Sequence, residues 1–532
     1  MEFDFVIVGA GSAGCVLANR LSADPSVTVA LIEAGGRDAS PWIHVPVGYF
    51  KTIKDPALNW MYRTEPDEGL NGRQLNWPRG KTLGGSSSIN GLLYVRGQPQ
   101  DYERWRQMGN VGWGWDDLLP LFRRSESWEG EAGALRGDRG ELSVSRSRQS
   151  WQVVDAWVEA ARTAGFAFNP DYNGQSQEGV GYFQLTARNG LRCSSAKAFL
   201  KPARSRPNLE VLTHIQVENV ELDGSRAVAV RGDRRGSPVR IAARREIILS
   251  AGAIGSPQIL MLSGIGEPGH LGDHGISLKH ALPGVGQNLQ DHLQARPVYR
   301  CNAPTINTRT RGLFNQARIG LEYMLNRSGP LTLAASLGTG FLKTRPDLET
   351  PDIQFHIQPF SANNPTTDTD DFDAFTASVL QLRPESTGEI RLRSARPGDH
   401  PLIHPNYLAT PLDQQTLVEG IRMARRICRQ PPVADLITEE HAPGPSVPDE
   451  DFDGLLDWAR NTATTIYHPT GTCKMGRDRM AVVDERLRVH GIDGLRVADA
   501  SIMPVIVSGN TNAPAIMIGE KASDMIREDM RA

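Results

Sequence analysis

The chain begins with a pattern of apolar positions that predicts a strand, a helix and a second strand. Residues 5–8 are all apolar and mostly β-branched, and residues 27–33 form a second, largely apolar run that ends in an acid. Short apolar runs of this kind are typical of strands buried on both faces of a parallel sheet. The small and apolar residues at 13–22 lie between them and predict a helix that packs closely on the strands.

Two later segments repeat the change from an apolar strand to a helix. Residues 246–250 predict a strand, and a helix is expected to begin near Ser256-Pro257 because proline suits the first turn of a helix. Near the C-terminus a short strand is expected to end at Asp499, and a helix to begin at about Pro514. Ahead of the first of these strands, residues 231–245 mix basic with small and apolar side chains, which predicts a solvated hairpin.

The composition fits one large domain or two to three interleaved ones, at roughly 150 residues per domain. The 532 residues are 39% hydrophobic, which is enough for a substantial core. The formal charge is −3 and no long run of lysine and arginine occurs. The charge pattern therefore gives no basis for binding nucleic acid or a strongly anionic membrane surface.

The cysteines and the N-terminus indicate where the protein works. Five cysteines are scattered along the chain without a CxxC pair, which argues against a disulfide framework or a zinc site and for a reducing compartment. We expect no metal site. The N-terminus lacks the basic segment of a signal peptide, and its apolar run is too short to span a bilayer. We expect a cytoplasmic protein, with peripheral contact to the inner face of a membrane left open.

The first predicted strand runs directly into GAGSAG, which places glycines at Gly9, Gly11 and Gly14. Gly9 permits a tight turn, Gly11 lets a pyrophosphate approach the backbone, and Gly14 lets the helix pack against the strand. Glu33 ends the second strand, where a carboxylate can accept both hydroxyls of an adenosine ribose and repels a 2′-phosphate. This context predicts an ADP-containing dinucleotide other than NADP, and by itself it leaves FAD and NAD open.

Three further segments carry distinctive residues. RGKTLGGSSSINGLLYVRGQPQDYE spans 79–103, LSAGAIGSPQILMLSGIG spans 249–266, and TATTIYHPTGTCKMG, with His468, precedes a GNTN segment with Asn510. Together with the glycine fingerprint and in this order, they resemble the glucose–methanol–choline (GMC) oxidoreductases, flavoenzymes that oxidise alcohols. The resemblance covers essentially the whole chain and is closest to bacterial choline-dehydrogenase-like and aliphatic-alcohol dehydrogenases.

The resemblance implies an α/β fold. A Rossmann-type FAD-binding domain is assembled from separated segments, and an α+β substrate-binding domain, an antiparallel sheet with helices, is inserted between them. We assign residues 1–150, 205–295 and 455–532 to the FAD-binding domain. Residues 151–204 and 296–454 are assigned to the substrate-binding domain.

The resemblance also implies FAD as the cofactor. Ile89 stands where some relatives carry the histidine that links FAD covalently, so we expect FAD to be held non-covalently. Glu33 and the three fingerprint glycines would hold the ADP half, and the helix expected near Pro514 would direct its N-terminus at the flavin, where reduced flavin carries negative charge. The resemblance further implies Gly84, Gly85, Asn90 and Gly91 beside the pyrophosphate and isoalloxazine, Val217 at the adenine, Asp499 at the ribityl–pyrophosphate region and Asn512 at the flavin pyrimidine edge.

His468 and Asn510 match the two active-site positions of the family. Oxidation of an alcohol removes a proton from oxygen and a hydride from carbon. A histidine pKa of ~6.5 lies ~9 units below an alcohol pKa of ~15.7, a gap of about 12 kcal/mol. His468 can therefore accept the proton only if its transfer is coupled to hydride loss or if the oxyanion is stabilised, and the Asn510 amide can donate to that oxygen. Pro469 stiffens the loop, while the resemblance leaves His274, His292 and His356 without a role.

Leu337, in LTLAASLGTGFLKT, stands where choline-oxidising relatives carry a carboxylate. A leucine favours an uncharged aliphatic or aromatic alcohol over a quaternary ammonium. We therefore expect oxidation of a primary alcohol to an aldehyde by hydride transfer to FAD, with a quinone, a cytochrome or O₂ as the final electron acceptor. Choline dehydrogenase, peroxide-producing alcohol oxidase, flavin-bound lyase and non-catalytic flavoprotein stay open as alternatives, as does the oligomeric state.

Overall fold

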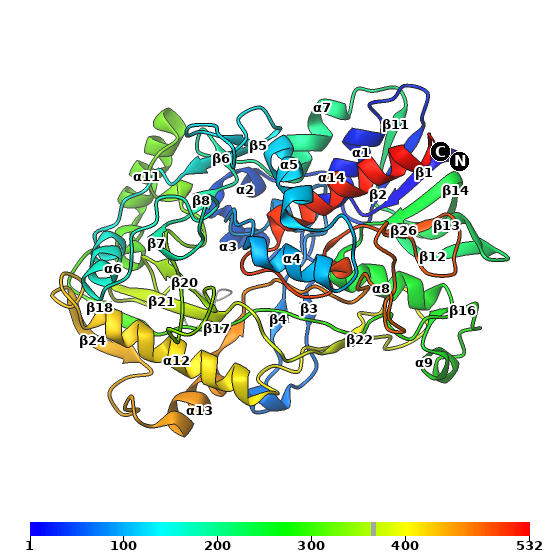
Figure 1. Cartoon of the computed structure of the whole chain (residues 1–532). Helices are drawn as coiled ribbons and strands as arrows, with labels where there is room; N and C mark the ends of the chain where they lie inside the picture. The colour runs from blue at the N-terminus through cyan, green and yellow to red at the C-terminus, as the bar shows by residue number, and fades with distance from the viewer. Residues whose placement is uncertain (363–368, 532) are drawn as a thin grey trace.

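Two large β-sheets form the framework of the molecule, with helices packed around them (Figure 1). The structure is a computed structural model that describes residues 1–362 and 369–531. The two ends of the chain lie beside each other at one end of the molecule, next to the first sheet (Figure 1). A cavity whose wall includes residues from both sheets lies inside this framework.

The first sheet has seven strands and a parallel centre. Its order is β11-β2-β1-β14-β13-β12, and β26 also pairs with β14. Ile7 of the central strand pairs with Leu31 on one side and Ile248 on the other, both in parallel register. An antiparallel hairpin confirms the one predicted at 231–245. The strands are β1 (Glu2–Val8), β2 (Val29–Glu33), β11 (Leu209–Thr213), β12 (Gln216–Asp223), β13 (Arg226–Arg234), β14 (Ser237–Leu249) and β26 (Leu495–Val497).

Helices α1 (Ser12–Leu21) and α14 (Asn512–Asp529) pack against each other and lie side by side in Figure 1, so the first and last parts of the chain are joined. Gly14 is required for the tight packing of α1, since a Cβ there would lie 1.9 Å from the carbonyl oxygen of Gly9. The predicted N-terminal strand, helix and second strand are confirmed. The C-terminal helix is confirmed too, beginning at Asn512 rather than at Pro514.

Helix α8 (Gly252–Leu262) corrects one prediction. It begins at Gly252 rather than near Ser256-Pro257, and it takes Pro257 into its interior. An interior proline leaves the carbonyl four residues earlier without its N–H donor. That carbonyl belongs to Ala253, and the Thr472 hydroxyl donates to it at 2.6 Å. The replacement donor comes from a distant loop, so the residues around Pro257 could not reveal it.

The second sheet has eight strands and is antiparallel. Its order is β24-β18-β21-β20-β19-β7, and β17 joins β21 to β25. Helices α6 (Gln152–Thr163) and α12 (Pro411–Cys428) pack on this sheet, and the rings of Trp157 and Phe355 lie 5.4 Å apart. Successive side chains of β20 point to opposite faces of the sheet, so His356 and Gln358 lie on the face opposite Phe355 and line the cavity. The strands are β7 (Gly179–Tyr182), β17 (Leu293–Ala295), β18 (Val298–Cys301), β19 (Gly338–Leu342), β20 (Ile353–Gln358), β21 (Ala374–Gln381), β24 (Ile437–Ala442) and β25 (Thr464–Thr465).

The two sheets confirm the predicted α/β fold class, a Rossmann-type sheet assembled from separated segments with an antiparallel sheet and helices inserted between them. The first sheet draws strands from 2–33, 209–249 and 495–497. The second draws strands from 179–182, 293–442 and 464–465, so the chain crosses between the sheets several times. The domain limits given above stay a prediction.

Shorter elements connect the sheets and enclose the cavity. Further helices are α2 (Pro41–His44), α3 (Tyr49–Thr52), α4 (Pro99–Gln107), α5 (Trp115–Ser125), α7 (Lys201–Ala203), α9 (Pro268–Asp273), α10 (Ile306–Arg309), α11 (Leu313–Asn326) and α13 (Phe452–Thr462). Short turns of helix are η1 (Pro46–Gly48), η2 (Glu68–Leu70), η3 (Gly85–Ser88), η4 (Ala196–Leu200), η5 (Pro330–Thr332) and η6 (Ala500–Ile502). Short strands are β3 (Tyr62–Arg63), β4 (Asn76–Trp77), β5 (Glu126–Trp128), β6 (Leu142–Arg146), β8 (Gln184–Leu185), β9 (Ala187–Arg188), β10 (Leu191–Arg192), β15 (Ile265–Gly266), β16 (His280–Ala281), β22 (Glu389–Arg391) and β23 (Leu402–His404).

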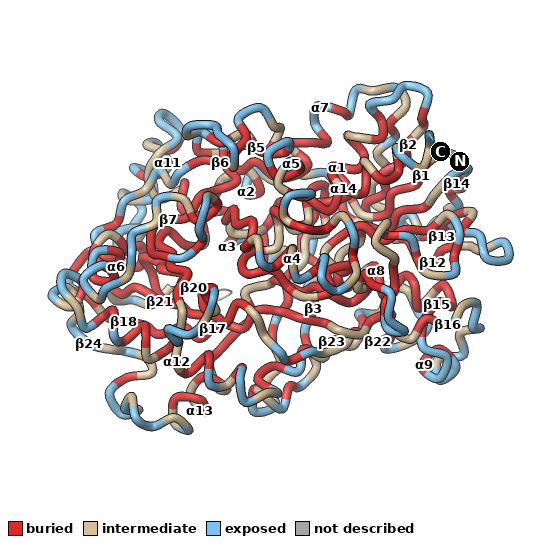
Figure 2. The backbone as a smooth tube through the Cα atoms, in the orientation of Figure 1, coloured by how far each residue is buried: buried red, intermediate tan, exposed pale blue. Residues whose placement is uncertain are grey.

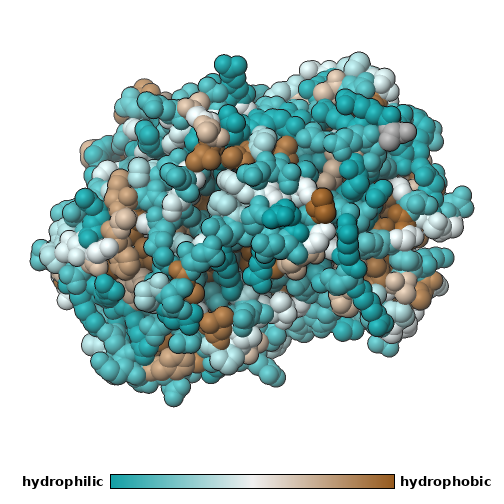
Figure 3. Space-filling view, viewed as in Figure 1, coloured by the Kyte–Doolittle hydropathy of each residue, from teal (hydrophilic) through white to brown (hydrophobic). Residues whose placement is uncertain are grey.

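Buried residues form a continuous interior that runs through both sheets (Figure 2). The face of the molecule in Figure 3 is largely hydrophilic, with apolar side chains in small groups. All five cysteines are buried and unpaired. Within residues 1–362 and 369–531, none of the helices combines the length and the apolar character that crossing a bilayer requires.

Candidate active site

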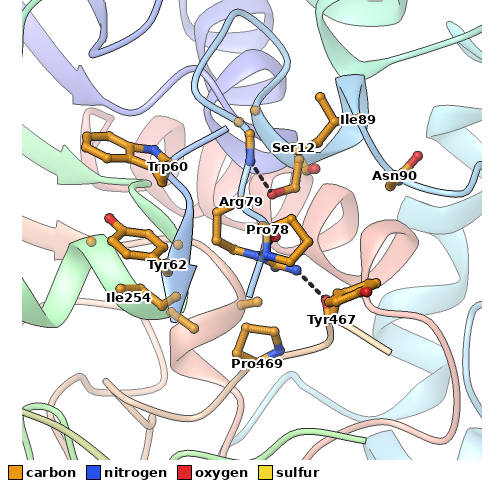
Figure 4. Close-up of a pocket in the computed structure, with 18 of the residues that line it drawn as sticks. Ser12, Trp60, Tyr62, Pro78, Arg79, Ile89, Asn90, Ile254, Tyr467 and Pro469 are labelled. Atoms are coloured by element: carbon orange, nitrogen blue, oxygen red, sulfur yellow. Dashed lines mark hydrogen bonds between the residues drawn. The ribbon is translucent and has the colours of Figure 1, made fainter. Parts of the chain in front are cut away.

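A cavity of about 320 Å³ brings together most of the residues that the sequence singled out. Figure 4 shows part of its wall, where Arg79 reaches toward Tyr467 and the rings of Trp60 and Tyr62 lie to one side. Two of the predicted residues, Gly14 and Gly84, lie behind the wall. Those that line the cavity are Gly9, Gly11, Glu33, Gly85, Asn90, Gly91, Val217, His468, Asp499, Asn510 and Asn512.

The first glycine loop presents its backbone to the cavity. Gly9 has a φ of 103°, and a Cβ there would lie 2.4 Å from the carbonyl oxygen of Ser250, so no other residue fits. A Cβ at Gly11 would find its nearest neighbour 3.9 Å away, which means that this side of Gly11 faces open space. The loop therefore has room for a group that lies directly against its backbone.

Glu33 lies at the end of β2 and its carboxylate is held in place by two backbone donors. The Gly35 N–H donates to one oxygen at 2.8 Å and the Ala10 N–H donates to the other at 3.1 Å. Burial raises the pKa of Glu33 to about 7, while the two N–H donors favour its charged form. The carboxylate lines the cavity with lone pairs left for the hydroxyls of a ribose.

Three helices begin at the cavity without a hydrogen bond from an N-cap side chain. These are α1, α8 and α14, whose N-cap residues are Gly11, Ala251 and Thr511. Helix N-termini carry N–H groups without intrahelical partners and a partial positive charge. A Cβ at Gly252, in the first turn of α8, would meet no atom within 4 Å. This set of donors around open space fits the pyrophosphate and the negatively charged flavin edge of FAD.

A buried arginine holds the second glycine loop in place. Arg192 donates to the side-chain oxygen of Asn90 at 2.6 Å and to its backbone carbonyl at 2.7 Å. Burial lowers the pKa of Arg192 to about 9. The two glycine loops touch, since a Cβ at Gly85 would lie 2.8 Å from the Cα of Gly11, and the Gly84 N–H donates to the first loop at 2.8 Å. Gly84 thus joins the two loops, while Asn90 lines the cavity.

The other predicted cofactor residues lie on the same wall. Val217 is in β12, where the register with β13 shifts. The carboxylate of Asp499 accepts from the Gly252 N–H at 2.9 Å and so ties the last strand to the start of α8. The side-chain oxygen of Asn512 accepts from the Ser12 hydroxyl at 2.8 Å, which joins the first turns of α14 and α1. These hydrogen bonds within the protein hold the cavity wall in place.

His468 and Asn510 lie together in the wall of the cavity. The Asn510 side-chain amide donates to His468 Nε2 at 3.0 Å. The amide oxygen of Asn510 accepts from Gln354 of β20 at 3.5 Å, so its N–H side is turned toward the imidazole. His468 follows β25 and Asn510 precedes α14, and both residues are buried.

A second histidine determines which nitrogen of His468 is basic. His292 Nε2 lies 2.9 Å from the carbonyl oxygen of Leu382, and because a carbonyl only accepts, this nitrogen carries the proton. In the neutral ring His292 Nδ1 is then an acceptor, and His468 Nδ1 lies 3.0 Å from it. His468 Nδ1 therefore carries the proton, and the lone pair on its Nε2 accepts from the Asn510 amide.

Asp291 and Arg79 hold the backbone of this loop. The His468 N–H donates to one Asp291 oxygen at 2.6 Å, and the Thr465 hydroxyl donates to the other at 2.5 Å. Tyr467 adopts a left-handed conformation with a φ of 71°, and Arg79 donates to its carbonyl at 2.6 Å (Figure 4). Pro469 then restricts the chain on the far side. The imidazole is therefore held in one orientation before any ligand binds.

Burial keeps the histidines at this end of the cavity neutral. It lowers the pKa of His292 to about 4 and that of His356 to about 3. It also lowers the pKa of His468 well below its ordinary value, and the nearby His292 and His356 add to this effect. At neutral pH, His468 is therefore uncharged and able to accept a proton.

Leu337 does not lie where the sequence placed it. Its side chain is 1% exposed, within the core, and it is absent from the lining of the cavity. The carbonyl of Leu337 accepts from the Phe183 N–H at 2.8 Å and its N–H donates to Ile357 at 3.0 Å, which turns the neighbouring Ser336 toward the cavity instead. From this position Leu337 gives no basis for inferring the charge of the substrate.

Three positioning residues were missed from the sequence. Asp291 and His292 lie in QNLQDH, a segment that was noted without a role, and Arg192 was not singled out. An acid and a histidine side by side ahead of a strand indicate a functional segment, but the sequence does not show that their partner is His468. His292 and His468 are 176 residues apart, and only the fold brings them into contact.

Comparison with known proteins places the chain in a family. Sequence profiles described as GMC oxidoreductase match residues 3–294 and 384–519. The chain is 44% identical over 528 residues to an alcohol dehydrogenase [acceptor] of Pseudomonas putida, covering 98% of this chain and 95% of that protein. It is 43% identical over 536 residues to the mitochondrial choline dehydrogenase of Mus musculus, covering 99% of this chain and 89% of that protein.

Solved structures agree with these sequence relationships. The structure superposes on pyridoxine 4-oxidase from Mesorbium loti with a TM-score of 0.90 and 31% identity, covering 99% of both chains. A variant of formate oxidase from Aspergillus oryzae gives a TM-score of 0.93 and 28% identity, covering 100% of this chain and 99% of that one. The chain therefore belongs to the GMC oxidoreductases, enzymes that act on CH–OH donors and whose cofactor is FAD.

Proposed function

We propose that the protein is an FAD-dependent dehydrogenase that oxidises a primary alcohol to an aldehyde. The observation that carries the proposal is the unprotonated Nε2 of His468, which lies 3.0 Å from the Asn510 amide in the cavity that the glycine loops also line. The alcohol dehydrogenase of Pseudomonas putida, to which the chain is 44% identical, supports this class of substrate.

His468 and Asn510 divide the work at the hydroxyl group. His468 Nε2 accepts the hydroxyl proton, and the Asn510 amide donates to the oxygen as negative charge develops there. FAD, when bound, supplies the acceptor for the hydride that leaves the alcohol carbon with two electrons. The carbon–oxygen bond then becomes double and the aldehyde forms. Because the histidine is the weaker base by ~9 pKa units, proton transfer must be coupled to hydride loss.

The fixed tautomer supports this division. His468 gains its proton on Nε2 while Nδ1–H stays bonded to His292, so the ring does not turn during the reaction. The Leu382 carbonyl in turn holds the proton of His292. Reacting groups that are oriented in advance lower the entropic part of the barrier.

We also propose that FAD is bound without a covalent link. Ile89 lines the cavity beside the second glycine loop, and a hydrocarbon side chain has no atom that can attack the flavin. The glycine backbones, Glu33 and the three helix N-termini would hold the cofactor through non-covalent contacts.

Anaerobic mixing with alcohols tests the proposed function. The holoenzyme should lose the absorbance of oxidised flavin when mixed with a primary alcohol, and one aldehyde should form per flavin reduced. A secondary or tertiary alcohol of the same size serves as the control. Flavin that stays oxidised with every primary alcohol would contradict the proposal. Release of peroxide in air at the rate of turnover would identify an oxidase instead of a dehydrogenase.

A further inference from the structure

A buried arginine without a partner lies in the wall of the cavity. Arg296 is 5% exposed, and none of its three guanidinium nitrogens has a hydrogen-bond partner in the part of the chain that the structure describes. Burial lowers the pKa of Arg296, and Tyr467, Tyr49 and Asp370 oppose this effect through space. The Asp370 carboxylate already accepts from the Ser361 hydroxyl at 2.6 Å. A guanidinium stays charged in proteins, and a buried charge is costly unless it is paired. Arg296 is therefore arranged for an anion that comes from outside the protein.

The strand that carries Arg296 also leads to the catalytic end of the cavity. His292, Gln294 and Arg296 alternate along β17 and its extension, so their side chains lie on one face of the sheet. His292 contacts His468, while Gln294 and Arg296 line the cavity. At ~3.3 Å per residue, the Cα atoms of residues 292 and 296 lie about 13 Å apart. A molecule of several carbons can thus place one end at His468 and the other at Arg296.

Other atoms on this wall are also without partners. Among the described residues, Gln294 Oε1, Gln358 Oε1 and His356 Nε2 make no hydrogen bond, although all three side chains are buried. The lining of the cavity also includes the apolar side chains of Phe50, Phe360 and Ile466. A wall that combines apolar side chains with a few unpartnered polar groups suits a ligand that has both hydrocarbon and polar parts.

We propose that Arg296 binds a carboxylate of the substrate, so that the alcohol oxidised at His468 is a hydroxy acid with its hydroxyl and carboxylate at opposite ends. This inference rests on the proposed function and names the substrate class of the same site. A planar guanidinium binds a carboxylate through two parallel hydrogen bonds, which makes it selective for that group. The same charge repels choline, which would bring a cation to the cavity.

Three alcohols of equal length test the assignment. Anaerobic flavin reduction would be measured with 6-hydroxyhexanoate, 1-hexanol and 6-amino-1-hexanol, followed by hydroxy acids of four, eight and ten carbons. We expect kcat/KM for 6-hydroxyhexanoate to exceed that for 1-hexanol by about 10- to 100-fold, as a charged hydrogen bond provides, and the amino alcohol to be the poorest substrate. Arg296→Gln should remove the preference for the hydroxy acid. Its kcat/KM for 1-hexanol should stay within about threefold of the wild-type value.

Binding measurements separate substrate recognition from folding. Hexanoate has no hydroxyl to oxidise and should bind the holoenzyme in calorimetry. Its affinity should fall by at least about tenfold in Arg296→Gln and should partly recover in Arg296→Lys. Arg231→Gln, on the exposed β13 strand, is the matched control and should bind hexanoate as the wild type does. Turnover of 1-hexanol with no preference for the hydroxy acid would overturn this inference alone. Failure of every alcohol to reduce the flavin would overturn the proposed function and this inference with it.

The outer face of α11 carries an independent inference. Leu313, Phe314, Met324 and Leu325 are 87%, 82%, 74% and 71% exposed, and Leu321 joins them on the same face of the helix. The helix lies at the edge of the molecule in Figure 1, and Figure 2 draws it largely exposed. Exposed apolar side chains in one continuous group are uncommon on a surface that contacts only water.

The charges around α11 point to a specific partner. Four exposed arginines, Arg309, Arg311, Arg318 and Arg327, lie within or beside the helix. Its single acid, Glu322, accepts from the Ser328 hydroxyl at 3.0 Å. These arginines are spread over 19 positions rather than gathered in a run, which is why the sequence indicated no basic patch. Two copies of the chain that met through this face would bring like charges together.

We propose that α11 lies in the interface of a membrane that contains anionic phospholipids. Apolar side chains enter the boundary between headgroups and acyl chains, and the flanking arginines meet the phosphates. This arrangement binds the protein to the membrane surface without a spanning helix.

Flotation with vesicles tests this proposal on the full-length holoenzyme. The wild type should float with phosphatidylcholine vesicles that contain phosphatidylglycerol, and less with phosphatidylcholine alone or at high salt. A variant with Phe314→Ser and Leu325→Ser should lose most of the bound fraction, and Arg318→Gln should lose part of it. Leu278→Ser, at an exposed position elsewhere, is the control. A wild type that stays unbound, or a dimer in sedimentation that only the double variant abolishes, would overturn the proposal.

Discussion

His292 and His468 face each other through their Nδ1 atoms, 3.0 Å apart, with rings at 87°. Only one of two such nitrogens can carry the shared proton when both rings are neutral, and the Leu382 carbonyl decides which one does. A backbone carbonyl thereby fixes the basic nitrogen of a side chain that it does not touch. His292 is a positioning residue in this arrangement, since it acts on the reaction through His468.

The first prediction concerns this pair. His292→Phe should lower kcat/KM by about 10- to 100-fold, as loss of an orienting partner does, because His468 could then turn or change tautomer. His292→Gln should restore much of the activity, since its amide can donate to Leu382 and accept from His468. Stopped-flow flavin reduction and pH profiles of both variants are the measurements. Equal losses in the two variants would mean that His292 only fills space.

The second prediction concerns His468 itself. His468→Ala should lower the rate of flavin reduction by about 10²- to 10⁴-fold, the usual contribution of a positioned base. This corresponds to about 3 to 5 kcal/mol of barrier. The FAD content should stay near that of the wild type, because Glu33 and the fingerprint glycines, which are assigned to the cofactor, are unchanged. A variant with full FAD content and full reduction rate would remove His468 from the role of base.

The third prediction concerns pH. Burial places the pKa of His468 well below the ordinary ~6.5 of histidine, and only the neutral form accepts a proton. Lowering the pH through the depressed pKa protonates His468 and lowers kcat/KM, so the acidic limb should lie below pH ~6.5, with a plateau at neutral pH. Profiles of kcat/KM against pH with an uncharged alcohol measure this. A limb centred at or above pH 7 would contradict the assignment.

The local patterns explain which parts of the fold could be predicted from the sequence. Gly9, Gly14 and Glu33 have roles set by the backbone within one βαβ unit, so their spacing was enough to place them. Pro257 has a role set by Thr472, which comes from another part of the chain, and the start of α8 was accordingly misjudged. Local rules fail where a distant residue supplies the missing hydrogen bond.

The candidate site shows the same division. His468 and Asn510 were placed through family motifs, and the structure brings them within hydrogen-bond distance. Leu337 was placed by position in a variable region, and its side chain lies in the core instead. Arg296 follows an apolar strand in a segment without any known motif, and its meaning comes from the absence of a partner among the described residues, which no sequence pattern reports.

The fourth prediction concerns the attachment of FAD. Because Ile89 offers no nucleophilic atom, acid or heat precipitation of the holoenzyme should leave the yellow cofactor in the supernatant. Mass spectrometry of the intact chain under denaturing conditions should give the mass of the polypeptide without flavin. Ile89→Val should behave in the same way and serves as a control for the effect of changing this position. Flavin that stays with the precipitated protein would contradict the prediction and point to another attachment site.

The fifth prediction concerns Asn510. Its amide donates to His468 Nε2 at 3.0 Å in the free site, and an alcohol oxygen placed between the two groups can accept from the amide while donating to the imidazole. The donor matters most when that oxygen becomes negative, so its loss should appear in the chemical step rather than only in substrate binding.

Asn510→Ala should therefore slow flavin reduction at saturating alcohol by about 10²-fold, within the lower range for loss of one oxyanion donor. The acidic limb of the pH profile should remain, because Asn510 does not titrate and His468 is still present. Asn461→Ala, on the exposed end of α13, is the matched control and should reduce flavin at the wild-type rate. If Asn510→Ala raised KM and left the rate of reduction unchanged, Asn510 would bind the ground state of the alcohol and would not stabilise the developing charge.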